Sequence, residues 1–275
     1  MQIKTSLFKL FAFSLFFTAS TTVHSFSLLG VNPTAWDPGA NTARFGGFPA
    51  PGGATWSIIG EGVSDSLGLE RDIFGNLLHG GNTTTSLAAL NPSLDIVSII
   101  DNAFDTWASV SNFTNLGQVD DSGLGFGVSE SGSASFGDIR IGAIAFDGPG
   151  GVLAHAYQPG TEAQFINGSI AGDIHIDNDE NWLDGFDLAT VLLHEIGHAL
   201  GLGHSDDMSS VMFAFLSPGE VNLELAADDI AGIQFIYGAT DAGPAVVPLP
   251  GAPILFLSAL GLIGFIKRRR ASISS

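Results

Sequence analysis

The chain has 275 residues, a formal net charge of -19 at pH 7 and no cysteine. All 28 acidic residues lie between Asp37 and Asp241, and the only basic side chains in that stretch are three arginines. Such an acidic surface repels nucleic acids and anionic membranes, so those two classes of partner are excluded for the central part of the chain. The lack of cysteine excludes disulfide bonds, and bound ions are therefore the expected means of stabilising an exported domain.

Residues 1–25 have the features of a secretory signal peptide. Lys4 and Lys9 come before the apolar stretch 10–17, and small residues then offer a cleavage site. The apolar stretch is short for a helix that spans a bilayer, although an uncleaved anchor is the alternative interpretation. Residues 26–53 are rich in glycine and proline, show little periodicity, and are expected to form an irregular leader.

A single mixed domain is expected between residues 54 and 240, because strand-like patterns come first and helices lie before, within and after them. Asn91 followed by Pro92 predicts a helix start, and apolar residues then recur at helical spacing as far as Trp107. The expected fold class is α/β (α+β), with one mixed, twisted sheet and three main helices. The expected strands are 55–59, 138–141, 152–157 and 174–177, and the expected helices are 91–107, 187–200 and 226–237.

The most informative motif starts in the second of these helices and reads H-E-x-x-H-x-x-G-x-x-H from His194 to His204. On a helix, His194 and His198 lie one turn apart and within about 40° of each other, so both imidazoles can bind one ion. His204 can join them only if the chain turns, and Gly201 can adopt the left-handed conformation that ends a helix. Three neutral imidazoles leave a fourth zinc position open for water, which is typical of a catalytic zinc site.

Glu195 lies beside the first of these ligands and is the candidate general base. The alternative is a buried helix whose histidines are incidental. Against this, the helix already has an apolar stripe at helical spacing, and His194 and His198 point roughly 120° away from its centre. The stripe consists of Leu188, Val191, Leu192, Ile196 and Ala199.

Residues 241–275 combine a linker with a second sorting or transmembrane segment. A Val-Pro-Leu-Pro box at Val247 leads into an apolar run that ends at Ile266, and four basic residues follow. The stretch from Val246 to Ile266 is long enough to span a membrane with its basic end in the cytoplasm. The tail resembles the PEP-CTERM sorting signal of Gram-negative bacteria, and this resemblance implies recognition by an exosortase. An ordinary membrane anchor is the alternative.

From Trp56 to Gly238 the chain resembles the matrixin branch of the metzincin metallopeptidases. The resemblance rests on the zinc motif and on three further segments, Phe146–Tyr157, Gly172–Trp182 and Asp228–Gln234. The first two are similar to the calcium-binding loop of that family and to the strand that follows it, and the third is similar to its terminal helix. A metzincin of another branch is the alternative, but these acidic loops favour a matrixin.

The resemblance implies a catalytic zinc ion held by His194, His198 and His204, with Glu195 as general base in peptide-bond hydrolysis. Zinc polarises the scissile carbonyl and lowers the pKa of water, and a carboxylate beside it can move the proton to the departing amine. Met212 lies eight residues after the third histidine, where the family has the Met-turn methionine that packs beneath the zinc ligands.

The resemblance also implies structural metals. Asp147, Asp177 and Glu180 match calcium-ligand positions and offer the hard oxygen ligands that calcium prefers, although a solvated acidic loop is the alternative. The family's second zinc uses residues that match His155 and His175, but the preceding loop here lacks the His-x-Asp pair that completes that site. Two ligands do not close a tetrahedral site, so these two histidines are expected to be packed strand residues and the second zinc weak or missing.

Together these features predict an exported zinc endopeptidase that cleaves proteins of the cell envelope or extracellular matrix of a Gram-negative bacterium. The expected partners are protein or peptide substrates and an exosortase-type enzyme. Membrane contact is expected only through the C-terminal segment, and no nucleic acid is expected to bind. The alternative function is a non-catalytic, metal-binding matrix or adhesion protein that retains the fold. Intact Glu195 argues against this alternative, because a protein without activity does not need a base at that position.

Overall fold

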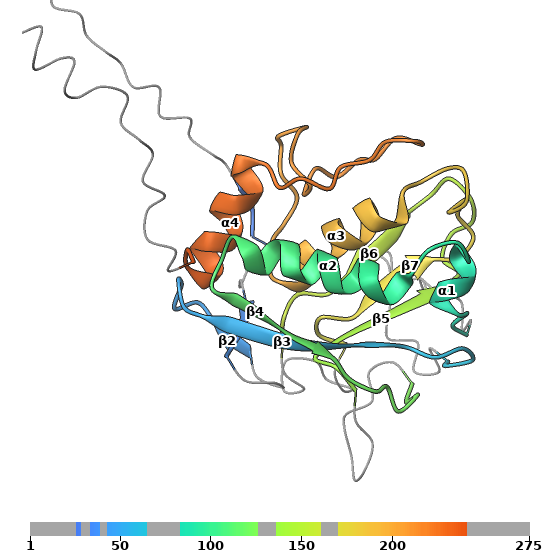
Figure 1. Cartoon of the computed structure of the whole chain (residues 1–275), viewed down its shortest axis with the longest axis horizontal. Helices are drawn as coiled ribbons and strands as arrows, with labels where there is room; N and C mark the ends of the chain where they lie inside the picture. The colour runs from blue at the N-terminus through green and yellow to red at the C-terminus, as the bar shows by residue number, and fades with distance from the viewer. Residues whose placement is uncertain are drawn as a thin grey trace, which may run out of the picture.

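A computed structural model describes residues 26–28, 34–38, 43–64, 83–125, 136–160 and 170–240. The expected signal peptide and the C-terminal sorting segment lie outside the described residues. Figure 1 shows the arrangement of the helices and strands along the chain. In chain order they are β1 (Thr34–Trp36), β2 (Ala43–Phe45), β3 (Gly52–Ile58), α1 (Leu87–Leu90), α2 (Ile96–Ser109), β4 (Phe113–Gln118), β5 (Ile139–Ile144), β6 (Ala154–Ala156), β7 (Ile174–Asp177), α3 (Leu188–Ala199) and α4 (Ala227–Tyr237).

A five-stranded sheet with the order β4-β3-β5-β7-β6 forms the centre of the domain. Neighbouring strands are parallel except for β6, which runs antiparallel to β7 at one edge. All six residues of β5 are buried, as expected for the middle strand of a sheet that is covered on both faces. The expected mixed sheet with three main helices is therefore confirmed, and α1 adds a fourth helix of only four residues.

The main core lies between this sheet and the pair of helices α2 and α3, which pack against each other on one face of the sheet (Figure 1). Trp56 of β3 stacks on Phe104 of α2, with 6.0 Å between ring centroids. Trp107, also on α2, is fully buried and its indole N–H donates to the Leu193 carbonyl of α3 at 3.0 Å. These contacts fix the position of α3 relative to α2 and the sheet.

Helix α2 begins four to five residues later than the sequence predicted. Asp95 is the residue that caps it, and its carboxylate accepts a hydrogen bond from the Ser98 backbone N–H. The Asn91 side chain makes other contacts: its oxygen accepts from Ser93, and its amide N–H donates to the Trp182 carbonyl at 2.9 Å. The prediction of a helix start at Asn91 was wrong because a contact distant in the sequence takes up the side chain that was expected to cap the helix.

The segment expected to be an irregular leader contains a small two-stranded sheet. Strands β1 and β2 pair antiparallel, and the chain then enters β3 at Gly52. Thr34, Ala35 and Trp36 are all buried. The Trp36 indole N–H donates to the Ala199 carbonyl, 163 residues later in the chain, so no local pattern in the sequence could indicate this contact. Among the described helices, none is long and apolar enough to cross a membrane.

Candidate active site

Helix α3 carries the first two histidines of the motif and is fixed at both ends. Asp187 caps its start, where the carboxylate accepts from the backbone N–H of Thr190 at 2.8 Å and from its hydroxyl at 2.6 Å. All five residues of the expected apolar stripe are buried in the core. The helix ends at Ala199, and Gly201 turns the chain with a φ of 109°. This left-handed conformation strains other residues, so the glycine allows the chain to fold back.

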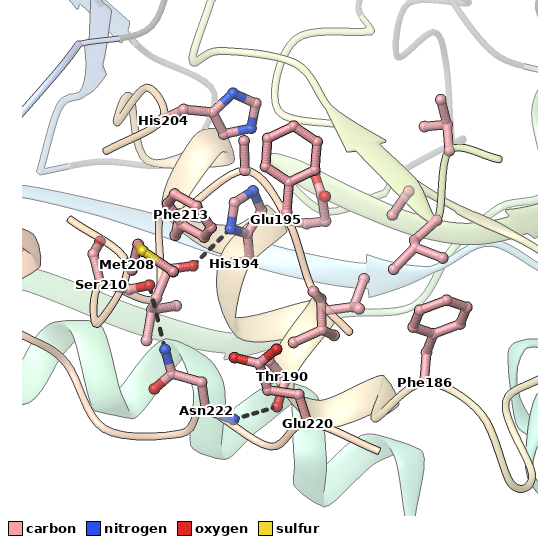
Figure 2. A pocket seen from close by; sticks show the side chains of 18 of the residues that line it. Phe186, Thr190, His194, Glu195, His204, Met208, Ser210, Phe213, Glu220 and Asn222 are labelled. Carbon is pink, nitrogen blue, oxygen red and sulfur yellow. Dashed lines mark hydrogen bonds between the residues drawn. The ribbon is translucent and has the colours of Figure 1, made fainter. Parts of the chain in front are cut away.

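The turn brings His204 back to the two histidines of α3. Each of the three residues offers a ring nitrogen, and these three nitrogens all lie within 4.8 Å of one another. The Nε2 atoms of His198 and His204 are 3.1 Å apart. Figure 2 shows His194 and His204 beside Glu195 at the same pocket. The expected convergence of the third imidazole on the other two is thus present in the structure.

The two histidines on α3 are oriented by backbone carbonyls. The Nδ1 atom of His194 lies 2.7 Å from the Val211 carbonyl, and that of His198 lies 2.8 Å from the Leu202 carbonyl. A carbonyl only accepts, so each Nδ1 carries the proton and each Nε2 has a free lone pair for a metal. Burial lowers the pKa of His194 to about 4 and that of His198 well below its ordinary value, so both rings are neutral at pH 7.

Glu195 is buried beside this cluster, and only 5% of the residue is exposed. Its Oε2 atom is buried and has no hydrogen-bond partner among the described residues. Burial raises the pKa of Glu195 to about 8. A buried carboxyl oxygen without a hydrogen-bond partner is costly unless a ligand or cation lies beside it. A cation held by the three neighbouring imidazoles would meet this need. The residues present therefore fit a bound zinc ion.

Met212 is buried and packs against α3 at Gly197, the residue before His198. A Cβ atom at Gly197 would collide with its sulfur, so this glycine within the motif makes room for the methionine. The backbone around Met212 is held by Asp229 of α4, which accepts from the Val211 N–H at 2.8 Å and the Met212 N–H at 3.2 Å. Sequence analysis placed Asp229 in the terminal helix but did not predict this contact, since nothing local links the two segments.

A pocket of about 490 Å³ opens beside His194 and Glu195. The loop that leads into β6 and the first residue of that strand, Gly150 to Ala154, line one side of it, and the segment after Met212 lines the other side. The far end is fixed by hydrogen bonds, because Asn222 N–H donates to the Thr190 hydroxyl at 3.0 Å and Gly219 N–H donates to the Gly185 carbonyl at 2.8 Å. Figure 2 shows Thr190, Glu220 and Asn222 at this end and Phe186 beside it.

The expected calcium ligands lie on two loops that touch each other. Glu180 accepts hydrogen bonds from the N–H groups of Gly150 and Gly151, at 2.7 and 3.0 Å. Asp177 is fully buried, and its Oδ2 atom has no partner among the residues described. Asp147 accepts from the Val152 N–H on the same loop. The structure joins the two loops through these backbone contacts, but it does not gather the three carboxylates into one tight cluster.

His155 and His175 face each other across the antiparallel pair of β6 and β7. His155 Nε2 lies 3.2 Å from His175 Nδ1, and His175 is fully buried. Phe146 stacks on His155 with 4.7 Å between ring centroids. This packed, hydrogen-bonded arrangement is the one predicted for the pair. Within the described ranges, no third His, Cys, Asp or Glu joins them at metal-ligand distance.

A model of one protein family, the matrixins, matches residues 82–238. The interstitial collagenase of Equus caballus is 40% identical over 159 residues, which cover 54% of this chain and 29% of that protein. Matrilysin of Homo sapiens is 47% identical over 114 residues, or 37% of this chain and 40% of its own. Metalloendoproteinase 2-MMP of Arabidopsis thaliana is 37% identical over 165 residues, which cover 53% of this chain and 38% of that protein.

The chain thus spans less than half the length of each of these relatives. Within the shared region, the match contains all three histidines, Glu195 and Met212. The family uses a catalytic zinc ion and structural calcium, and the three-histidine cluster is compatible with the first of these metals. Because the family match covers more than half of its residues, the chain belongs to the matrixins, a family of zinc metalloendopeptidases.

Proposed function

We propose that this protein is an exported endopeptidase in which His194, His198 and His204 hold zinc and Glu195 is the general base. The observation that carries the proposal is the buried, unpartnered Oε2 atom of Glu195 beside three converging imidazoles. The two α3 imidazoles are already held in the tautomer that a metal requires, with Nδ1 bound to carbonyls.

Zinc bound at this cluster would polarise the scissile carbonyl, lower the pKa of water, and favour the ionised form of the neighbouring carboxylate. Glu195 accepts the proton of the attacking water and delivers it to the nitrogen of the departing amine. The water oxygen bonds to the carbonyl carbon, and the C–N bond then breaks with its electron pair leaving on the protonated nitrogen. The low exposure of Glu195 keeps bulk solvent from competing for that proton.

The substrate is proposed to be an extended protein segment that lies along the edge of the sheet. Strand β6 is the last strand in the sheet order and the residues before it line the pocket beside Glu195. An edge strand offers backbone groups that can pair with an extended peptide. The pocket walls include Phe186, Val191 and Leu216, which suit an apolar side chain of the substrate.

The sequence supports a secreted location for this activity. Residues 1–25 have the composition of a signal peptide, residues 54–240 would be the catalytic domain, and residues 241–275 contain the Val-Pro-Leu-Pro box and apolar run of a sorting segment. We propose that an exosortase-type enzyme recognises the latter in a Gram-negative bacterium. Structural calcium is proposed to bind the loops that contain Asp147, Asp177 and Glu180.

The proposal is tested by replacing the base and measuring metal and activity separately. The full chain with Glu195→Ala should keep its zinc, because the carboxylate is not a ligand, and its kcat/KM on unfolded casein should fall roughly 100- to 10,000-fold. Glu61→Ala removes an exposed carboxylate outside the pocket and should leave both zinc content and cleavage at the wild-type values.

The main alternative is a metal-binding matrix or adhesion protein without catalysis. It predicts that the zinc-loaded wild-type chain cleaves neither casein nor a broad peptide library. That result would overturn the proposed activity while leaving the family membership and the metal site intact.

A further inference from the structure

The turn between α3 and His204 is contacted at every residue from Ala199 to Gly203 by parts of the chain far from the zinc motif. The contacts come from Ser27, Leu28, Thr34 and Trp36, all before the region matched by the family model, and from Tyr237 at the end of α4. The turn is short and contains two glycines, so it has little stiffness of its own. Whatever holds it determines where His204 lies.

The last carbonyls of α3 are paired with two buried side chains. The indole N–H of Trp36 donates to the Ala199 carbonyl at 2.9 Å, and the Tyr237 hydroxyl donates to the Leu200 carbonyl at 2.9 Å. The two donors are linked, because the Trp36 backbone N–H donates to the Tyr237 hydroxyl at 3.3 Å. Carbonyls at a helix end have no partner within the helix, so buried donors at this place fix its last turn.

The next three residues are held by the N-terminal segment. A Cβ atom at Gly201 would lie 2.6 Å from the Thr34 carbonyl oxygen, so β1 packs directly on the glycine that turns the chain. Leu202 forms a bridge with Leu28, and the Gly203 N–H donates to the Ser27 carbonyl at 2.9 Å. The Leu202 carbonyl is also the acceptor that orients His198, so this support reaches a second histidine.

The N-terminal strand is itself fastened to α4. The guanidinium of Arg44 donates to the Trp36 carbonyl at 2.6 Å and to the Ile236 carbonyl at 3.4 Å, and it lies over the Tyr237 ring. Gly52 and Gly172 leave room for Trp36 and Tyr237, since a Cβ at either glycine would collide with them. Trp36 is 2% exposed and Tyr237 is not exposed at all. The Trp36 and Tyr237 side chains are therefore tightly packed, and the polar atom of each makes a hydrogen bond.

We propose that Trp36 and Tyr237 are positioning residues for the zinc site. They hold the end of α3 and the turn that follows, so that the Nε2 atoms of His198 and His204 stay directed at the same point. This inference rests on the proposed function, because it assigns a role in holding the metal of that site. It adds two residues outside the zinc motif, one of which lies outside the matched family region.

The test compares three conservative variants of the full chain. Trp36→Phe and Tyr237→Phe each remove one hydrogen-bond donor to the end of α3 while keeping an aromatic ring. Trp56→Phe is the matched control, because Trp56 is 1% exposed and its indole nitrogen has no acceptor among the described residues. It loses the same volume from the core without releasing a helix carbonyl. All are measured below the temperature at which each begins to unfold.

The readouts are the rate of zinc loss to an excess of chelator and the visible absorption of the cobalt-substituted protein, which reports ligand geometry. Trp36→Phe and Tyr237→Phe should lose zinc roughly 10- to 100-fold faster than wild type, as is typical when a residue that orients metal ligands is changed. Their cobalt spectra should be altered. Trp56→Phe should lower the melting temperature but keep the wild-type rate and spectrum.

The inference is overturned if Trp36→Phe and Tyr237→Phe release zinc no faster than Trp56→Phe. Tyr237→Phe removes a single oxygen atom and decides the question alone if Trp36→Phe does not accumulate as folded protein. A wild-type chain that holds no zinc at all would overturn the proposed function, and the positioning role with it. If the wild-type chain holds zinc and cleaves casein, the proposed function stands. The zinc-loss rates of the variants then test the positioning role alone.

Discussion

Arg140 and Asp121 form a buried ion pair on the face of the sheet opposite α2 and α3. The arginine Nε donates to Asp121 Oδ2 at 2.9 Å and its Nη2 donates to Oδ1 at 2.8 Å, with side-chain exposures of 1% and 3%. Ser57 of β3 also donates to this carboxylate. The pair ties the loop after β4 to two central strands, so its effect is expected on stability rather than on catalysis.

Asp121→Asn should lower the free energy of unfolding by about 3–5 kcal/mol, because it removes the carboxylate that accepts two hydrogen bonds from the buried Arg140 guanidinium and leaves Asp173 as the remaining counter-charge. Guanidinium denaturation of the zinc-loaded chain measures this change. Asp120→Asn removes a neighbouring exposed carboxylate and should have little effect. Equal destabilisation by the two variants would mean that the loss of one negative charge, and not the loss of the ion pair, lowers the free energy of unfolding.

The same pair gives stability a dependence on pH in acid. Burial acts to raise the pKa of Asp121, but the hydrogen bonds and charge of Arg140 outweigh it and the pKa lies below its ordinary value. A lowered folded-state pKa contributes stability above the unfolded-state value, and this contribution is lost as the pH falls through the folded-state value. The difference in free energy of unfolding between wild type and Asp121→Asn should therefore become smaller in strong acid.

The contacts of single residues differ in how well the sequence could predict them. The spacing of His194, His198 and His204 was enough to predict their convergence, because helix geometry and one glycine turn determine it. Asp229 and Trp36 could not be predicted from local pattern. Their partners, the Met212 backbone and the end of α3, are brought to them only by the complete fold.

At the scale of elements, the two acidic loops that flank β6 and β7 depend on each other. Glu180 caps two backbone N–H groups of the loop after β5, and Asp177 accepts from the Phe146 N–H on the same loop. Burial raises the pKa of Asp177, and the nearby carboxylates of Asp179 and Glu180 also raise it. A calcium ion would offset that repulsion and fasten the loop that forms one wall of the pocket.

Removal of calcium with a selective chelator should lower the melting temperature of the wild-type chain by several degrees, as expected for a bound ion that stabilises only the folded state. Asp177→Asn should have a low melting temperature already and should no longer respond to calcium. Asp184→Asn, at an exposed site, should respond as wild type does. A response that survives in Asp177→Asn would place the ion elsewhere.

Elements whose own sequence carries a periodic pattern were predicted well. Strand β7 has the expected bounds, and α3 and α4 each lie within one residue of them at either end. The start of α2 was misplaced because two good capping residues, Asn91 and Asp95, compete and only the fold selects the second. Strands β1 and β2 were missed because they are three residues long and are stabilised by distant partners.

At the scale of the whole molecule, the two groups of histidines are arranged differently, and this bears on the number of zinc ions that we expect the chain to hold. The three histidines at the end of α3 converge, whereas His155 and His175 are hydrogen-bonded to each other. The segment between β5 and β6 contributes no histidine that could complete a second site. The protein as a whole is therefore expected to retain one zinc ion.

Metal analysis of the purified full chain should give about one zinc per molecule, since a structural site needs four ligands. His155→Gln should leave this number unchanged, and His204→Ala should greatly reduce it. His79→Gln controls for the loss of a histidine that belongs to neither the zinc motif nor the His155 and His175 pair in the sequence. Two zinc ions in the wild type, with one lost in His155→Gln, would contradict the expectation.

The contacts of Trp36 join parts of the polypeptide that are made at very different times during translation. Its bonds reach across 163 residues to Ala199 and across 201 residues to Tyr237. Contacts of such sequence separation form late, because the intervening polymer must first be ordered. On the role proposed for Trp36, a chain that is still being made on the ribosome has not yet assembled the proposed zinc site. The proposed hydrolysis would therefore begin only after the whole domain has folded.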